Sequence, residues 1–299
     1  MSVWDAEIRR EAAPTRAGRT MTRQSEAEGK GPLARQERLV RMAEMVLAAG
    51  SVHIEDLVKA FGVSAMTVYR DIASLEDSGV VHRARGLISA AATSLNETTS
   101  QFRLTQNTVE KAAIAARARQ FVRPGRSVML DDSSSAYWLL QEIVDVGPLT
   151  IVTNSQHIAR EAGNRPGIEL FVTGGIYRAV TDSFYGGTTT SVISNLRADV
   201  CFLSATAVGG GNLYHPYEEV VDVKRAMLGA AVLKVLLVDH TKFERHALHV
   251  IGPVSCVDVV VVDALTRPED LEPFRAAGVR VEIAEPNEPV PAKDESTWH

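Results

Sequence analysis

The residues best suited to binding chemistry in the second half of the chain follow short apolar runs. Asp131 and the triplet Ser133, Ser134 and Ser135 come directly after the run 128–130 and before a stretch with helical spacing. The first backbone N–H groups of a helix lack partners within that helix, and with nearby hydroxyls they bind anions. Serines after a strand are common, so this triplet alone predicts an anion site only weakly.

Three further loops follow apolar runs in the same way, at 153–155, 173–175 and 239–242. Open α/β sheets bind ligands at the carboxyl ends of their strands, so these loops should meet the serine triplet. A glycine pair allows close backbone approach, and a lysine can neutralise a phosphate. The candidate ligand-binding residues are Asp131, Ser133, Ser134, Ser135, Thr153, Asn154, Ser155, Gly174, Gly175, Glu219, Lys224, Asp239 and Lys242.

Purely structural roles remain open for several of these residues. Asp131 and Asp239 are equally suited to capping helices or binding backbone amides. His215, His240, His246 and His249 lack the spacing of zinc ligands, so surface or core roles are favoured. With only Cys201 and Cys256, the chain has neither a disulfide framework nor a four-cysteine zinc site. The sequence predicts no metal and no cofactor.

A second group of residues lies near the start of the chain, where two expected helices, 54–61 and 65–77, are joined at Gly62 and Val63. This spacing is typical of a helix-turn-helix, whose second helix enters the major groove of DNA. The apolar residues that share the inward face of that helix are Val68, Ile72 and Leu75. Its outer face and the basic turn around Gly86 supply the candidate DNA-binding residues Ser64, Met66, Thr67, Tyr69, Arg70, Ser74, Arg83 and Arg85.

Composition limits the class of protein. The chain has 299 residues, 45% apolar and 23% charged, which fits a soluble protein of about two domains. No uncharged apolar run approaches the ~18 residues that span a bilayer, and residues 1–20 lack the apolar core of a secretion signal. The net charge is −5, and residues 31–90 hold seven basic and seven acidic side chains. The case for DNA binding therefore depends on where the charges lie and not on their number. The protein is expected to be cytoplasmic.

The hydrophobic pattern predicts an α/β fold class in two domains. We expect a polar tail at 1–33, a winged helix-turn-helix at 34–90, a polar linker at 91–106, a mostly parallel α/β domain at 107–285 and a tail at 286–299. Apolar runs without alternation suit strands buried on both faces. The expected strands are 127–130, 149–153, 168–173, 199–204, 234–239, 257–263 and 279–283. The expected helices between them are 109–121, 137–144, 156–162 and 219–233.

Residues 50–86 closely resemble the N-terminal domain of the DeoR family of bacterial transcription regulators. The matching positions are Val63, Ser64, Thr67, Val68, Arg70, Asp71, Ile72, Leu75, Gly79 and Arg83. Two positions depart from the family pattern. The family usually has two arginines before the aspartate, where Tyr69 stands first here, and its wing usually ends in His-Gly-Gly, where this chain has Arg85-Gly86-Leu87. The resemblance implies that this domain reads base edges in a groove of DNA. The two departures concern which operator sequence it reads.

Residues 107–265 resemble the effector-sensing domain of the same family. The family's Leu-Asp-Ser-Gly-Thr-Thr corresponds to residues 130–135, where hydroxyls are kept and the glycine is lost. Thr-Asn-Ser at 153–155, Gly-Gly at 174–175, Glu219 with Lys-Arg-Ala-Met at 224–227, and Asp-x-Thr-Lys at 239–242 also match. The resemblance implies a fold like ribose-5-phosphate isomerase and glucosamine-6-phosphate deaminase, and a phosphorylated sugar or related metabolite as the ligand.

The leading hypothesis is a transcription regulator, and specifically a repressor of a carbohydrate or related catabolic operon, controlled by that metabolite. Because one recognition helix covers only a half-site, the protein should bind double-stranded DNA as a dimer or larger oligomer. The first alternative is a sugar-phosphate isomerase or deaminase fused to a DNA-binding module, with Glu219, Lys224 and Asp131 as acid–base groups. The second is an oligomerisation module without a ligand. A regulator needs binding and not turnover, so no enzyme activity is expected.

Overall fold

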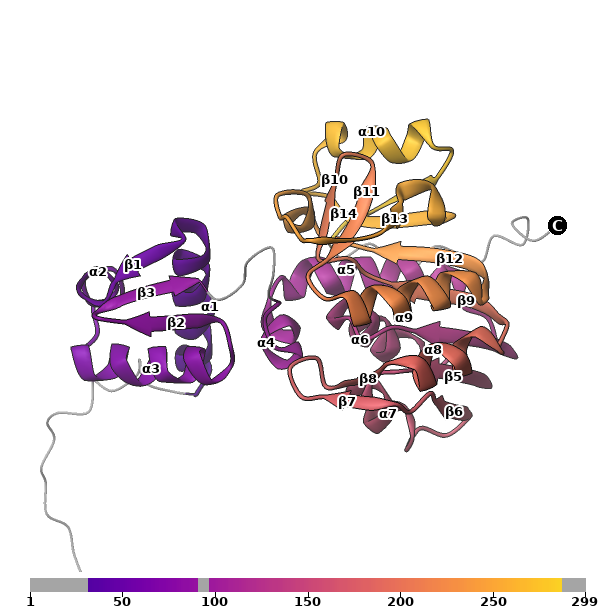
Figure 1. Ribbon diagram of the computed structural model, residues 1–299, viewed down its shortest axis with the longest axis horizontal. Coiled ribbons are helices and arrows are strands. Elements are labelled where there is room, and N and C mark those ends of the chain that lie inside the picture. The colour runs from indigo at the N-terminus through magenta and orange to yellow at the C-terminus, as the bar shows by residue number, and fades with distance from the viewer. Residues whose placement is uncertain (1–31, 91–96, 287–299) are drawn as a thin grey trace, which may run out of the picture. The chain divides into compact units, whose positions relative to one another are not determined.

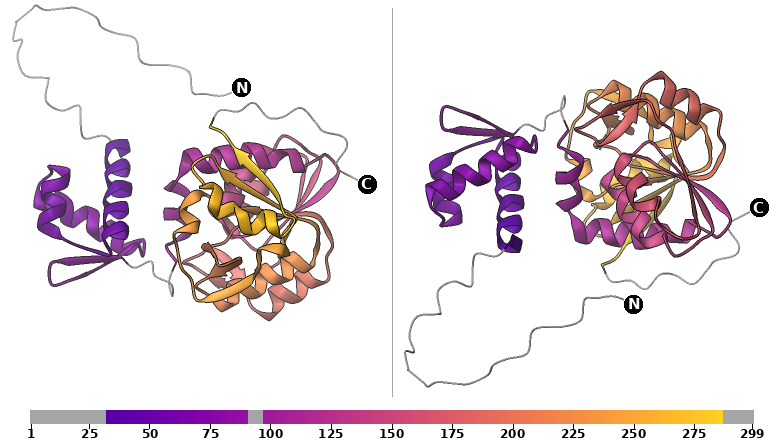
Figure 2. Two further views of the ribbon diagram at one scale, coloured as in Figure 1. Left: turned by 90° about the horizontal axis from the view of Figure 1, so that it is seen from above. Right: turned by 90° about the horizontal axis from the view of Figure 1, so that it is seen from below.

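The computed structural model describes two parts of the chain, residues 32–90 and residues 97–286 (Figures 1 and 2). The expected tails fall almost entirely outside these ranges, as do residues 91–96 of the expected linker. No helix within the two ranges is long and apolar enough to cross a membrane.

The first part is a winged helix-turn-helix. Its elements are α1 (Pro32–Ala49), β1 (Ser51–His53), α2 (Ile54–Phe61), α3 (Ala65–Asp77), β2 (Val81–Ala84) and β3 (Leu87–Ala90). Strand β3 lies between β1 and β2 and pairs antiparallel with both, so β2 and β3 form the wing. The expected helices 54–61 and 65–77 are confirmed as α2 and α3, and the basic turn around Gly86 joins β2 to β3.

The turn between α2 and α3 depends on Gly62 and Ser64. Gly62 has a φ of 61°, a left-handed conformation that ends α2, and its N–H donates to the carbonyl of Val58 at 3.1 Å. Ser64 begins α3, because its Oγ accepts the N–H of Thr67 at 3.2 Å. These two caps fix where each helix stops and starts, and so set the position of the recognition helix.

The inner face of α3 packs into the core of this part. Val68, Ile72 and Leu75 are buried, as expected. Asp71 lies among them at 1% exposure, and its carboxylate accepts a hydrogen bond from Arg38 Nε at 2.7 Å. Buried charges persist in proteins when they are paired, so this contact ties α3 to α1.

The second part is an α/β domain built around a seven-stranded parallel sheet. Its helices are α4 (Ser100–Thr105), α5 (Thr108–Ala118), α6 (Ser134–Ile143), α7 (Gln156–Ala162), α8 (Gly187–Ser194), α9 (Glu218–Gly229) and α10 (Pro268–Ala276). The strands of the sheet, in spatial order, are β15 (Arg280–Ala284), β14 (Val259–Asp263), β12 (Ala231–Leu237), β9 (Ala198–Leu203), β4 (Arg126–Leu130), β5 (Leu149–Thr153) and β6 (Ile168–Val172).

Helices cover both faces of this sheet (Figures 1 and 2). Val128 and Leu130 of β4 pack in one cluster with residues of α5, α6 and α7. Met129, between them, packs in the other cluster with residues of α8, α9 and α10. Successive side chains of a strand point to opposite faces, so a sheet covered on both sides needs apolar residues at every position. The positions of the seven strands were predictable for this reason.

Several elements lie outside what the pattern predicts. They are α4, α8, α10, the hairpin of β7 (Ile176–Arg178) and β8 (Ser183–Tyr185), and a small antiparallel sheet of β10 (Ala207–Gly209), β11 (Asn212–His215) and β13 (His249–Pro253). Strands this short give little periodicity. The expected helix 219–233 is wrong at its end: α9 stops at Gly229, and residues from 231 onward pair in β12 with β9 and β14.

Candidate functional site

The outer face of α3 presents the expected DNA-binding residues. Met66 and Tyr69 are 69% and 43% exposed, and Arg70 is exposed beside them. Thr67 is half-buried, and the Ser74 hydroxyl donates to the carbonyl of Arg70 at 3.1 Å within the helix. Apolar and cationic side chains that face water on such a helix suit thymine methyls, base edges and phosphates. The placement is that of a recognition helix.

The wing adds basic side chains to the same surface. Arg83 and Arg85 are exposed, and Arg85 lies in the turn before Gly86. The Arg83 guanidinium lies 5.9 Å from the centre of the Tyr69 ring, and Arg83 Nε lies 3.8 Å from the Glu76 carboxylate. These contacts connect the wing to α3, so a substitution of Tyr69 or Glu76 would also remove a contact of Arg83 in the wing.

A polar pocket opens in the second part at the carboxyl ends of β4, β9 and β12. From β4 the chain adds β5 and β6 on one side and β9, β12, β14 and β15 on the other. Open α/β sheets bind ligands at such a reversal of strand order. The pocket is small and open to solvent. It is lined by Glu97, Arg103, Asp132, Ser133, Ser134, Ser135, Ser204, Ala205, Thr206, His215, Lys224 and Lys242.

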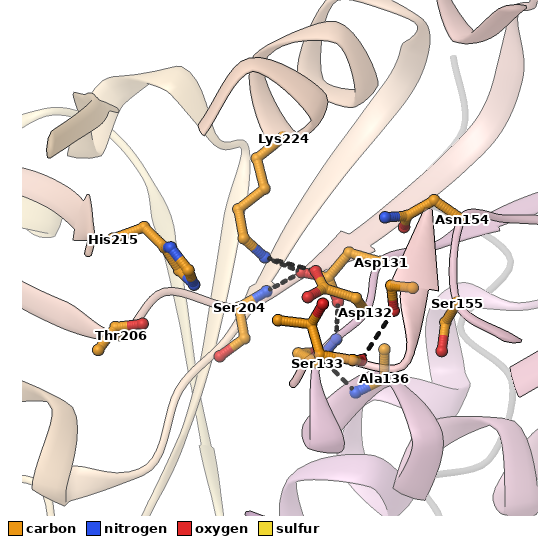
Figure 3. Close-up of polar contacts among 12 residues, drawn as sticks. Asp131, Asp132, Ser133, Ala136, Asn154, Ser155, Ser204, Thr206, His215 and Lys224 are labelled. Atoms are coloured by element: carbon orange, nitrogen blue, oxygen red, sulfur yellow. Dashed lines mark hydrogen bonds and ion pairs between the residues drawn. The ribbon is translucent and has the colours of Figure 1, made fainter. Parts of the chain in front are cut away.

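Lys224 reaches the pocket from α9 and lies between two carboxylates (Figure 3). It is 2% exposed; its ammonium donates to Asp131, and its Nζ lies 3.5 Å from Asp132 Oδ1. Asp131 also accepts the backbone N–H groups of Ser133 at 3.0 Å and Ser204 at 2.9 Å. Asp131 therefore positions Lys224 and two loop backbones from behind, whereas Asp132 lines the pocket.

The charges of this group support one another. Burial acts to lower the pKa of Lys224, but Asp131 and Asp132 outweigh it and the pKa is raised. Burial acts to raise the pKa of Asp132, but Lys224, Arg103 and a 2.7 Å hydrogen bond from the Tyr185 hydroxyl leave it lowered. Lys224 and Asp132 are therefore both charged at neutral pH.

The serine triplet begins α6 at the wall of the pocket. Ser133 Oγ accepts the N–H of Ala136 at 3.1 Å and so caps the helix. The N–H groups of Ser134 and Ser135 lie in the first turn, where no carbonyl of the same helix can reach them. These N–H groups and hydroxyls can receive anionic oxygens, and the partial positive charge of the helix end favours an anion there.

His215 on β11 faces the pocket as a neutral donor. Burial, with Lys224 nearby, lowers its pKa to about 4. Its Nδ1 accepts the backbone N–H of Tyr217 at 3.1 Å, so at neutral pH the ring proton lies on Nε2. Together with the hydroxyls of Ser204 and Thr206 (Figure 3), it suits the hydroxyl groups of a ligand.

Lys242 belongs to the short helix η2 (His240–Phe243) and brings a further cation to the pocket. It is 8% exposed, and among the described residues no hydrogen bond or ion pair reaches its ammonium. Burial and Arg245 lower its pKa, whereas Asp239 and Glu97 oppose that effect. The pocket thus holds a largely buried lysine whose ammonium has no bonded counter-ion in the described chain.

The expected residues 153–155 do not line the pocket. Thr153 Oγ1 accepts the N–H of Ser155 at 3.0 Å, and Ser155 Oγ caps α7 by accepting the N–H of Ile158 at 3.3 Å. Asn154 donates through Nδ2 to the carbonyl of Phe184 at 3.1 Å, and its Oδ1 is buried without a partner in the described ranges. The loop organises the backbone next to Asp131 and Asp132.

The expected glycine pair packs against α8. Gly175 has a φ of 122°, and a Cβ added there would lie 2.1 Å from Thr189 Oγ1 and 2.6 Å from the carbonyl oxygen of Tyr185. The same Thr189 hydroxyl donates to the carbonyl of Gly174 at 2.7 Å. Close backbone approach is present at this pair, and its partner is the protein's own helix.

Glu219 and Asp239 also have partners away from the pocket lining. Glu219 accepts three hydrogen bonds from Arg178 of β7, at 2.9, 3.2 and 3.0 Å. Asp239 begins η2, where its Oδ1 accepts the N–H of Thr241 at 3.1 Å and Asn107 Nδ2 at 3.0 Å. The capping role that the sequence left open for Asp239 is therefore present in the structure.

Six polar residues of the pocket escaped the sequence reasoning: Glu97, Arg103, Asp132, Ser204, Thr206 and His215. Ser204 is the last residue of the expected strand 199–204 and directly follows β9 in the structure, so the rule that selected the serine triplet would also have found it. Glu97 and Arg103 lie in a stretch that reads as a linker, and His215 lies on a strand too short to predict. For these three, nothing in the sequence pattern indicates the pocket.

Neither thiols nor metal ligands form a further site among residues 32–90 and 97–286. Cys201 is buried, Cys256 is partly buried, and both are free. Within the same ranges, no group of three or more His, Cys, Asp or Glu side chains is arranged to hold a metal ion.

Comparison with known proteins places both parts of the chain in one family. Residues 38–98 match the model of the DeoR-like helix-turn-helix domain, and residues 106–264 match the model of the DeoR C-terminal sensor domain. A solved ribose 5-phosphate isomerase A from Methanocaldococcus jannaschii aligns over 44% of this chain and 53% of its own, with 17% identity and a TM-score of 0.33. The chain therefore spans about half the length of that structure.

Two curated relatives align over most of their length. One is named as the aga operon transcriptional repressor of Escherichia coli O157:H7, with 30% identity over 82% of this chain and 92% of the relative. The other is the glycerol-3-phosphate regulon repressor of Escherichia coli K12, with 30% identity over 74% of this chain and 88% of the relative. With both domain models matched in order, the chain belongs to the DeoR family of transcription regulators.

Proposed function

We propose that this regulator represses a carbohydrate or related catabolic operon, and that a phosphorylated sugar or sugar-like metabolite in the pocket controls it. The observation that carries the proposal is the pocket itself, in which the start of α6 shares one small space with Lys242, whose ammonium has no bonded partner among the described residues. The relatives named above are repressors of an operon and of a glycerol-3-phosphate regulon, which supports the same class of ligand.

The polar groups of the pocket divide into two kinds that fit such a metabolite. Lys242, Ser134 and Ser135 offer a charge and N–H donors to a phosphate. Asp132 and His215 offer an acceptor and a donor to sugar hydroxyls. We assign Asp131, with the loops at 153–155 and 174–175, Glu219 and Asp239, to positioning these groups.

Lys242→Ala tests the pocket. Losing a charge-assisted contact in a partly dry site typically costs about 1.5–3 kcal/mol, so effector affinity should fall more than tenfold while operator binding is kept. Thermal-shift titration with a panel of sugar phosphates measures the affinity, because a ligand of the native state raises the unfolding temperature. Lys234→Ala, which removes a half-exposed charge paired with Asp258, is the control. A normal effector response from Lys242→Ala refutes the assignment.

Arg70→Ala tests the DNA surface. The exposed guanidinium adds about 1–3 kcal/mol if it reads a guanine and less at a phosphate, so operator affinity should fall several-fold. Thermal stability should not change, since the side chain packs on no core. Fluorescence anisotropy with operator DNA measures the effect, and Arg275→Ala on α10 serves as the matched loss of charge. Unchanged operator affinity would sink the role of Arg70.

The remaining parts of the proposal follow from the same surfaces. We propose a cytoplasmic protein that acts as a dimer or larger oligomer, because specific operator affinity normally needs two half-sites. We also propose binding without turnover. Lys224 is engaged by two carboxylates and His215 is a fixed neutral donor, so neither is poised as a mobile acid or base.

A further inference from the structure

Glu97 is an acidic side chain inside the pocket that ligand binding, as proposed above, does not use. It is 7% exposed and shares the pocket lining with Lys242 and Arg103. Its carboxylate accepts a hydrogen bond from the Thr206 hydroxyl, and its backbone N–H donates to the Tyr217 hydroxyl at 3.1 Å. The residue is therefore held to the pocket wall through both its side chain and its backbone.

The cations proposed to bind a phosphate also keep the Glu97 carboxylate charged. Burial acts to raise its pKa, but Arg103 and Lys242, with smaller contributions from His215 and Arg245, lower the pKa to about 2. In the described chain no ion pair joins Glu97 to Arg103 or Lys242, so the attraction acts across the pocket. A phosphate that contacts Lys242 would interact with the same positive charge and so weaken the electrostatic stabilisation of the Glu97 carboxylate.

Glu97 also begins the segment that follows the connection to the DNA-binding domain, residues 91–96. Six residues later the same segment supplies Arg103 to the pocket. The Lys111 ammonium donates to the carbonyls of Arg103 and Gln106, which fastens the end of α4 to α5. The segment is thus held at its start by Glu97 in the pocket and at its end by Lys111, and between them the backbone N–H of Ser100 donates to the carbonyl of Val180 at 2.9 Å. Of these attachments, the Glu97 side chain is the one that lines the pocket itself.

We propose that the Glu97 carboxylate is an internal counter-anion of the pocket, which the phosphate of a bound effector displaces. The inference rests on the proposed function, since it takes an anionic ligand in this pocket as given. Displacement frees residue 97 from Thr206 and loosens the start of the segment. Ligand binding thereby alters the residues next to the connection to the DNA-binding domain.

Glu97→Gln tests the competition with inorganic phosphate as the probe. The amide keeps the size of the side chain and an oxygen that can accept from Thr206, but it removes the charge. Calorimetric titration of the full chain at neutral pH should show phosphate binding roughly tenfold tighter than in the wild type. Glu272→Gln, an exposed loss of the same charge on α10, should bind like the wild type. Equal or weaker binding by Glu97→Gln overturns the proposal.

Hydrogen–deuterium exchange separates displacement from simple charge repulsion. Phosphate should speed the exchange of backbone amides at 97–103 in the wild type, whereas slower exchange there overturns displacement. Lys242→Ala keeps the two proposals distinguishable. If phosphate binds neither the wild type nor Glu97→Gln, the anion pocket fails. If phosphate binds the wild type, is lost in Lys242→Ala and is unchanged in Glu97→Gln, only the role of Glu97 fails.

Discussion

Replacing Lys224 with methionine should lower the free energy of unfolding by about 3–5 kcal/mol, because it leaves two buried carboxylates without their cation. Methionine keeps most of the side-chain volume, so the loss reports charge and not a cavity. Lys224 is 2% exposed between Asp131 and Asp132, which are also buried. Urea unfolding at neutral pH, followed by circular dichroism, measures the change.

The control and the pH dependence make this expectation specific. Lys234→Met breaks a half-exposed pair with Asp258 and should cost at most ~1 kcal/mol. The lowered pKa of Asp132 means that its stabilising contribution is present above its unfolded value near 4 and is lost as the pH falls through the folded value. In the Lys224→Met variant, protonation of the buried carboxylates removes their unpaired charge. The difference in free energy of unfolding between the variant and the wild type should therefore become smaller towards pH ~4. A Lys224→Met protein as stable as the wild type at pH ~7 contradicts the account.

Gly175→Ala should destabilise the sensor domain by about 3 kcal/mol, combining overpacking with a left-handed backbone that an L side chain resists. The added Cβ would lie 2.1 Å from Thr189 Oγ1 and 2.6 Å from the Tyr185 carbonyl oxygen, and the second neighbour is backbone that yields poorly. Because the Tyr185 hydroxyl donates to Asp132, the shift should also weaken effector binding. Thermal unfolding and effector titration check both effects.

Gly187→Ala is the matched control for this substitution. Gly187 is exposed at the first position of α8, has no positive φ, and an added Cβ meets no atom within 4 Å. Alanine there should leave stability unchanged or raise it by up to ~1 kcal/mol. If Gly175→Ala and Gly187→Ala unfold at the same temperature, the packing of Gly175 against Thr189 does not limit stability.

Local sequence determined the DNA-binding part almost completely. The caps at Gly62 and Ser64, the inward face of α3 and the basic turn of the wing are contacts between near neighbours in the chain. Such features follow from turn chemistry and helical period, and these do not depend on distant partners. The strands of the large sheet were predictable for a related reason, since burial on both faces leaves an unbroken apolar run.

The composition of the pocket was decided by the tertiary structure. Lys224 and Asp131 are 93 residues apart, and Glu97 and Thr206 are 109 apart. The sequence marks each only as a polar residue and cannot show which ones converge. The order of strands across the sheet brings β4, β9 and β12 together, and so selects Lys224 and Lys242 for the pocket and leaves Glu219 to Arg178. Long-range pairing of buried charges has no local pattern, because the energy that requires it exists only after the chain has folded.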